Sequence, residues 1–124
     1  MTGAARRFLS IALIYVFAQN TAVLLSTSLR QRSIATVDIS ELPREARQTI
    51  VLIKKGGPYP YRKDGVVFGN FERRLPLHER GYYREFTVPS PGARNRGARR
   101  IIQGKAGEFY YTDDHYETFR LVRE

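Results

Sequence analysis

The sequence predicts an α+β fold in which one N-terminal helix packs on a five-stranded antiparallel sheet, preceded by an apolar leader. Apolar residues recur at clear helical spacing in one segment, near residue 50. Beyond residue 58 they form short runs separated by turn residues at hairpin distances. The 124 residues suffice for one domain with a core and are too few for two.

The helix is expected over residues 44–53. Pro43 suits a first helical turn, and Ala46, Ile50 and Ile53 form one apolar stripe. The following KKGGP places cations and then glycine at the helix end, which stops it. The preceding TVDIS is expected only to lead into the helix. Five strands are expected after it, at residues 66–68, 81–88, 99–103, 109–111 and 118–122.

The leader differs in composition from the rest of the chain. Two arginines precede the apolar run 8–18, FLSIALIYVFA, and polar residues follow it. This order is typical of a secretory signal peptide, although no clean small-residue cleavage motif is present. A membrane anchor over residues 8–25 and an ordinary buried helix stay open as alternatives. We expect residues 1–32 to be a signal peptide or anchor and residues 33–124 to form the functional domain.

The domain itself is basic. The chain has a formal charge of +9, and three of these charges lie in residues 1–30, where there is no acid. The remaining net charge favours polyanionic partners: nucleic acid, an acidic surface or an acidic inhibitor. Cysteine is absent, which excludes disulfides, thiolate metal sites and cysteine nucleophiles.

The stretch 81–100 carries the residues of a candidate anion site. Alternation in its strand puts Tyr83, Glu85 and Thr87 on one face, opposite an apolar face that is the natural core. Glu85 is therefore expected on an open face. Arginines at positions 94, 96, 99 and 100 follow, and an arginine beside a carboxylate favours the ionised form that accepts a proton. On these residues alone, a surface salt bridge or a phosphate-binding patch without catalysis explains the pattern equally well.

Catalysis would also need an acid, and His115 is the candidate. It lies in the polar turn DDHY, where we expect it to be exposed, with Asp113 and Asp114 favouring its protonated form. A lone loop histidine is more often a bystander. Together with Glu85 and the arginines, it meets the needs of phosphodiester cleavage at a ribose: a base for the 2′-OH, guanidiniums for the phosphorus and an acid for the 5′-oxygen.

Four segments together resemble the microbial guanyl-specific ribonucleases, the barnase family, and most nearly its RNase Sa branch. They are DGVVFGNFE, GYYREFTV, PGARNRGARRII and YYTDDHYETF, and the similarity runs over about residues 36–122. The fold that this resemblance implies, a helix on a five-stranded antiparallel sheet, is the one that the periodicity predicts.

The resemblance also implies a role for individual residues. It makes Glu85 the general base, His115 the general acid, and Arg96 and Arg100 the phosphate-binding arginines, which leaves Arg94 and Arg99 as ordinary surface charge. Glu72 is implied to accept the N1 and N2 hydrogens of guanine, with backbone amides nearby binding O6. The other implied substrate contacts are Asn70, Phe71, Tyr83 and Tyr116.

The implied activity is that of a guanyl-preferring endoribonuclease. It would cut single-stranded RNA through a 2′,3′-cyclic phosphate to a 3′-phosphate, without a metal or other cofactor, and leave DNA intact. Phe71 stands where the family usually has arginine, so the guanine preference is expected to survive in weakened form. The protein is expected to be a secreted monomer. Two alternatives stay open: a basic RNA-binding module without catalysis, and the same nuclease used as an antibacterial toxin with an acidic barstar-like inhibitor.

Overall fold

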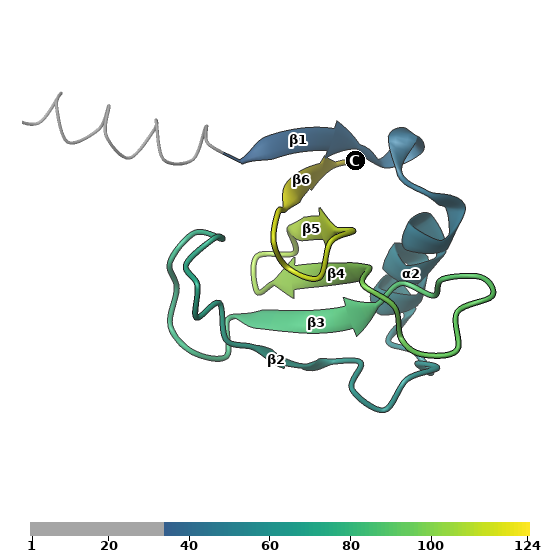
Figure 1. Ribbon diagram of the computed structural model, residues 1–124. Helices are drawn as coiled ribbons and strands as arrows, with labels where there is room; N and C mark the ends of the chain where they lie inside the picture. The colour runs from purple at the N-terminus through teal and green to yellow at the C-terminus, as the bar shows by residue number, and fades with distance from the viewer. Residues whose placement is uncertain (1–33) are drawn as a thin grey trace, which may run out of the picture. The chain divides into compact units, whose positions relative to one another are not determined.

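The computed structural model of the chain describes residues 34–124 (Figure 1). The expected leader, with its cleavage or anchoring, lies outside the described residues. Within the described part of the chain, no helix is long and apolar enough to cross a membrane.

One α-helix and a six-stranded sheet make up the described part of the chain. In the sheet the strands are ordered β1-β6-β5-β4-β3-β2. The elements are β1 (Ala35–Asp38), a 3-10 turn η1 (Ile39–Glu41), α2 (Arg44–Lys55), β2 (Val66–Phe68), β3 (Tyr83–Thr87), β4 (Arg100–Gly104), β5 (Phe109–Thr112) and β6 (Arg120–Arg123). The helix lies against one side of the sheet, and β2 forms the edge opposite β1 (Figure 1).

The α+β class and the packing of one helix on the sheet are confirmed, but the sheet has a sixth strand and is mixed. The segment before the helix, expected only as a lead-in, forms β1 and pairs in parallel with β6. Without β1, the outer edge of β6 would leave its backbone polar groups unpaired. An ion pair of 2.7 Å between Arg123 Nε and Asp38 Oδ1 lies at the same edge. The pairing of β1 with β6 joins residues that lie 85 positions apart, as Asp38 and Arg123 do, so no local signal in the sequence reveals it.

The helix forms for the predicted reasons and runs two residues beyond its predicted end. Ala46, Ile50 and Ile53 are buried as expected, in a core cluster with residues such as Phe86 and Ile101 from β3 and β4. Gly56 caps the C-terminus in a left-handed conformation (φ 82°), and its N–H donates to Ile53 O at 3.0 Å. This cluster is the core between α2 and the sheet.

The opposite face of the sheet, expected to be open, carries a second core. Tyr83 and Thr87 on this face are buried, so the expectation is wrong for both residues. The long connection between β2 and β3 folds back over this end of the sheet and buries Leu75 against it. The second cluster comprises Leu75, Tyr83, Ile102, Tyr110 and Phe119. Glu85 is thus set in a partly covered face rather than on an open surface.

Candidate active site

The register of the sheet brings the candidate residues together. Glu85 lies opposite Ile102, and Thr87 lies opposite Arg100, across the antiparallel pair β3 and β4. Directly opposed residues share a face of the sheet, so the side chains of Glu85, Thr87 and Arg100 emerge on the same side. This face is the one that α2 does not cover, because Phe86 on the other face packs in the helix core.

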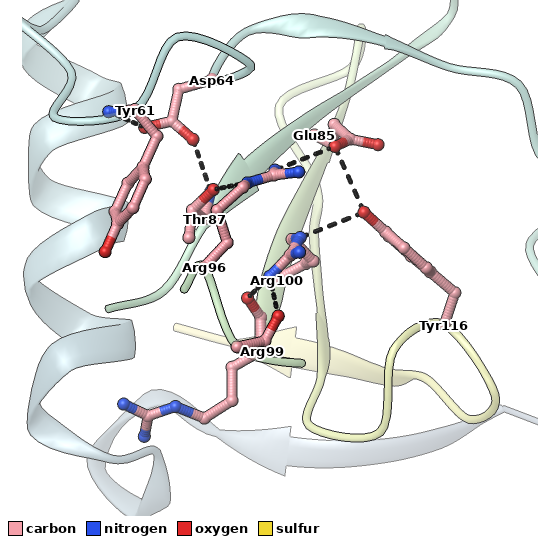
Figure 2. Close-up of polar contacts among 9 residues, drawn as sticks. Tyr61, Asp64, Glu85, Thr87, Arg96, Arg99, Arg100 and Tyr116 are labelled. Atoms are coloured by element: carbon pink, nitrogen blue, oxygen red, sulfur yellow. Dashed lines mark hydrogen bonds and ion pairs between the residues drawn. The ribbon is translucent and has the colours of Figure 1, made fainter. Parts of the chain in front are cut away.

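Arg96 contacts both Glu85 and Thr87, the next residue of β3 on the same face of the sheet. Its Nη2 lies 3.2 Å from Glu85 Oε1, and its Nε donates to Thr87 Oγ1 at 3.0 Å (Figure 2). The expectation that an arginine from this segment approaches Glu85 is therefore confirmed. Because the Glu85 side chain is only 13% exposed, this contact is better shielded from solvent than a surface salt bridge.

Arg100 is the most deeply buried charge of the site, at 2% exposure. Its Nε donates to the Tyr116 hydroxyl at 3.1 Å, and its Nη1 donates to Gly97 O at 2.9 Å and Arg99 O at 2.7 Å. Within residues 34–124, no carboxylate lies within ion-pair distance of this guanidinium. A buried cation without a counter-ion is unfavourable, so the position favours binding of an anion.

Tyr116 connects Glu85 with Arg100. Its hydroxyl donates to Glu85 Oε1 at 3.2 Å while it accepts from Arg100 (Figure 2). Burial, and next the Glu85 carboxylate, raise the pKa of the Tyr116 hydroxyl, so it stays a neutral donor at physiological pH. Its ring stacks on Phe68 with 5.3 Å between centroids. The Tyr116 hydroxyl thus orients the Glu85 carboxylate, and the Tyr116 ring lines one side of the site.

His115 stands at the rim of the cluster and is exposed, as the sequence predicts. Its ring centroid lies 4.8 Å from that of Tyr116, and its backbone N–H donates to Ala98 O at 2.9 Å. The neighbouring carboxylates have other partners: Asp113 pairs with Arg120 at 3.3 Å, and Asp114 accepts from Thr118 and Thr112. The hydrogen bond from the Thr118 hydroxyl, followed by one from its backbone N–H, lowers the pKa of Asp114 to about 2.

The candidate base-recognition loop, residues 69–76, is organised by Asn70. This residue has a left-handed backbone (φ 51°), its Oδ1 accepts from Leu75 N at 3.1 Å, and its Nδ2 donates to Leu75 O at 3.0 Å. The Glu72 carboxylate is 68% exposed. The Phe71 ring is 83% exposed and covers Gly69 so closely that a Cβ there would lie 2.4 Å from it. The loop therefore presents an acid and an aromatic ring to solvent.

Two predicted residues have surroundings that differ from the expectation. Tyr83 is 3% exposed, and its hydroxyl donates to Pro76 O at 2.6 Å, so it supports the base-recognition loop from beneath and offers no open ring face. Arg99 is not ordinary surface charge. It donates to Ser90 Oγ at 3.2 Å and to Pro89 O, and it pairs with Glu45 of α2 at 3.6 Å. Arg94 is exposed, as predicted.

Two further residues of the site escape sequence reasoning. The Asp64 carboxylate accepts from Thr87 N at 2.7 Å and from Tyr61 N at 3.1 Å, and so fixes the end of β3 beside Arg96 (Figure 2). Arg74 donates to Tyr116 O at 2.8 Å. The contacts of Asp64 with Thr87 and of Arg74 with Tyr116 each join residues more than twenty positions apart. The only local signal was the turn sequence KDG, which marks Asp64 as a turn residue and says nothing of its partner.

The chain is similar to known ribonucleases along most of its length. A ribonuclease family model matches residues 26–123. The chain is 58% identical to guanyl-specific ribonuclease Sa of Kitasatospora aureofaciens over 88 residues, which cover 70% of this chain and 92% of that protein. It is 55% identical to guanyl-specific ribonuclease St of Saccharopolyspora erythraea over 86 residues, covering 69% and 85%.

Two solved ribonuclease structures share the fold of this chain. Ribonuclease Sa2 with guanosine-2′-cyclophosphate matches with a TM-score of 0.70 and 51% identity, covering 73% of this chain and 96% of that one. Ribonuclease Sa2 in complexes with mononucleotides matches with a TM-score of 0.73 and 50% identity, covering 73% and 95%.

Proposed function

Because the chain belongs to the ribonuclease family, we propose that it is a guanyl-preferring endoribonuclease that cleaves single-stranded RNA by forming a 2′,3′-cyclic phosphate. Its guanyl-specific relatives are matched over 85% and 92% of their length. One observation of the site carries the proposal: the buried Arg100, which has no carboxylate partner among residues 34–124, shares the Tyr116 hydroxyl with a shielded carboxylate, Glu85. An anion site directly beside a candidate base suits attack of a ribose hydroxyl on its own phosphate.

In the first step Glu85 accepts the proton of the 2′-OH. The 2′-oxygen forms a bond to phosphorus, and the bond from phosphorus to the 5′-oxygen breaks as His115 donates a proton to that oxygen. Arg96 and Arg100 stabilise the charge that builds on the phosphoryl oxygens. The products are a 2′,3′-cyclic phosphate and a free 5′-hydroxyl.

In the second step the two proton carriers exchange roles. His115 accepts a proton from water, whose oxygen attacks phosphorus, and protonated Glu85 returns its proton to the leaving 2′-oxygen. The product is a 3′-phosphate, and both groups regain their starting protonation states. The nucleophile is the ribose 2′-OH, so DNA should not be cleaved.

Guanine preference is proposed to reside in the base-recognition loop. The Glu72 carboxylate would accept the N1 and N2 hydrogens of guanine, and backbone amides of residues 70–72 would bind O6. The exposed Phe71 ring offers a stacking surface where the family usually has arginine. Tyr83 is proposed to act indirectly, through its hydrogen bond to Pro76.

We further propose that the enzyme is exported as a monomer after cleavage of its leader, with anchoring through residues 8–25 as the alternative. The support is the order of residues in the leader, in which two arginines precede an apolar run and polar residues follow it. The basic site would also suit an acidic, barstar-like inhibitor if the enzyme serves as a toxin. Fractionation of the producing cells, with mass determination of the mature N-terminus, tests export. Co-purification of an acidic protein tests the inhibitor.

Product analysis on a defined RNA, with chelator present, tests the activity. We expect cuts predominantly 3′ of guanosine, an early cyclic phosphate that converts to a 3′-phosphate, and no cleavage of the matching DNA. Cuts spread evenly over the four bases would refute the role of Glu72. RNA binding without cleavage of a GpN dinucleotide would favour the non-catalytic binding module instead.

A further inference from the structure

Arg74 lies between the two segments that carry the proposed base reader and the proposed acid. Its Nη1 donates to Tyr116 O at 2.8 Å, next to His115. Its Nη2 lies 2.9 Å from Glu72 Oε2 and 3.4 Å from Glu117 Oε2. One planar guanidinium therefore uses different nitrogens for the turn at 115–116 and for the base-recognition loop.

The turn that Arg74 contacts adopts an unfavourable backbone conformation. His115 and Tyr116 have φ of 55° and 72°, in the left-handed region that side-chain-bearing residues rarely occupy. Such a conformation persists only where surrounding contacts hold it. The backbone N–H groups are held by Ala98 O at 2.9 Å and by Thr112 Oγ1 at 3.1 Å, and Arg74 holds the carbonyl at the end of the turn. The position of the His115 ring thus depends partly on Arg74.

On the other side, Arg74 restrains a carboxylate that is otherwise open to solvent. Glu72 is 68% exposed and precedes Arg73, which also has a left-handed backbone (φ 58°). In the part of the chain that the structure describes, no other side-chain hydrogen bond or ion pair joins residues 69–76 to residues 112–119. Arg74 is therefore the polar link between these two segments.

We infer that Arg74 is a positioning residue that couples recognition of the base by Glu72 to proton transfer by His115. This inference rests on the proposed function. When the correct base engages the Glu72 carboxylate, that carboxylate is fixed, and with it the guanidinium that it pairs with. The other side of the guanidinium then holds the Tyr116 carbonyl, and so the turn that aims His115 at the 5′-oxygen. A wrong base leaves the carboxylate, and therefore the acid, less well placed.

Arg74→Met tests the coupling, because methionine keeps an unbranched apolar stem and removes the guanidinium. Arg62→Met is the control: it removes the same charge from an exposed position outside the base-recognition loop and the cluster around Glu85. We measure kcat and KM for GpU and ApU. Arg74→Met should lower kcat on GpU about tenfold and lower the ratio of kcat/KM for GpU over ApU by a similar factor. The control should change both by less than about twofold.

Two further variants separate the two contacts of Arg74. In a Glu72→Gln background, Arg74→Met should still lower kcat but should not reduce the base preference any further, since the ion pair is already gone. Arg74→Lys keeps an ion pair with Glu72 but has one ammonium in place of two spaced nitrogens. Because the contact with the Tyr116 carbonyl is lost while Glu72 stays paired, it should lower kcat on GpU more than kcat on ApU and so reduce the GpU preference. A purely structural role of Arg74 would lower kcat equally on GpU and ApU and leave the ratio of kcat/KM for the two substrates unchanged.

A folded Arg74→Met protein whose kcat and GpU preference both stay within about twofold of the wild type would overturn the inference, as would a loss equal to that of Arg62→Met. If Arg74→Met does not fold, Arg74→Lys decides: a reduced kcat on GpU together with a reduced GpU preference supports the coupling, and wild-type kcat or an equal loss on both substrates overturns it. Failure of the wild-type protein to cleave GpU is a different outcome, because it refutes the proposed function itself.

Discussion

The proposed catalytic cluster and the proposed base-recognition loop are built on different parts of the fold and differ in exposure. Glu85, Thr87 and Arg100 project from paired strands, and their side chains hydrogen-bond to Arg96 and Tyr116. In the loop, by contrast, Phe71 and Glu72 are largely exposed, and the backbone contacts of Asn70 hold the conformation. The charges proposed to stabilise the transition state are thus pre-organised on the sheet, whereas the groups proposed to recognise the base lie on an exposed surface loop.

This contrast predicts that changes in the cluster lower the rate, while changes in the loop alter base preference. The largest effect is expected when a residue proposed to transfer a proton is replaced. Glu85→Gln keeps an oxygen that accepts from Arg96 and Tyr116 but removes the base, so kcat on GpU should fall by roughly 10²–10⁴-fold. The thermal unfolding midpoint should change little. A kcat within tenfold of the wild type would remove Glu85 from the mechanism, and His115→Ala provides the parallel test for the acid.

The second prediction concerns the buried cation of the cluster. Inorganic phosphate at ten times its dissociation constant should stabilise the wild-type protein by about 1.4 kcal/mol, because it binds only the folded state. Arg100→Met should abolish this stabilisation and lower kcat by roughly 10²–10³-fold. Calorimetric melts with and without phosphate measure the effect. The control is Arg94→Met, an exposed position at which the phosphate effect should persist; equal loss in both variants would mean that overall charge, not this site, binds the anion.

The third prediction addresses the loop. Asn70→Ala removes the side-chain hydrogen bonds to Leu75 while the left-handed backbone is still required, so it should destabilise the fold by about 1–3 kcal/mol and reduce the preference for GpU over ApU. Asn70→Gly loses the same hydrogen bonds but accepts the backbone conformation, so it should cost less. Urea unfolding and the ratio of kcat/KM for the two substrates measure both effects. If alanine and glycine behave alike, the backbone conformation is not what Asn70 maintains.

The smallest effect is expected at Asp114, which orders the segment behind His115. Its pKa in the folded protein is about 2, below the ordinary 3.8. A lowered folded-state pKa contributes stability that is present above the ordinary value and is lost as pH falls through the folded value. Asp114→Asn should therefore make the loss of thermal stability between about pH 5 and pH 2 shallower. Asp113→Asn is the matched control, and an unchanged acid slope for Asp114→Asn would contradict the prediction.

The sequence predicted the secondary-structure elements better than it predicted which residues would be buried. The helix at 44–53 and five of the strands lie within about two residues of their places in the structure, because each depends on local periodicity and turn residues. An approach of arginines from the segment 94–100 to Glu85 was expected, since a Pro/Gly turn returns the chain toward β3, and Arg96 makes this contact. The burial of Tyr83 and the role of Arg99 were not foreseen, because both depend on distant segments, the β2–β3 connection and α2.

By itself, the sequence determined the fold class and the helix with its stop, and it supplied the candidates for the acid, the base and the arginines that phosphodiester chemistry needs. Those features follow from side-chain periodicity, turn propensity and functional-group chemistry, all of which are local. Only the tertiary structure decided that β1 pairs with the edge of β6, that Arg100 is buried with no carboxylate partner in the described part of the chain, and that Arg74 joins the base-recognition loop to the His115 turn. Each of these depends on backbone groups or charges from residues far apart in the chain, whose pairing and desolvation are settled only when the segments pack together.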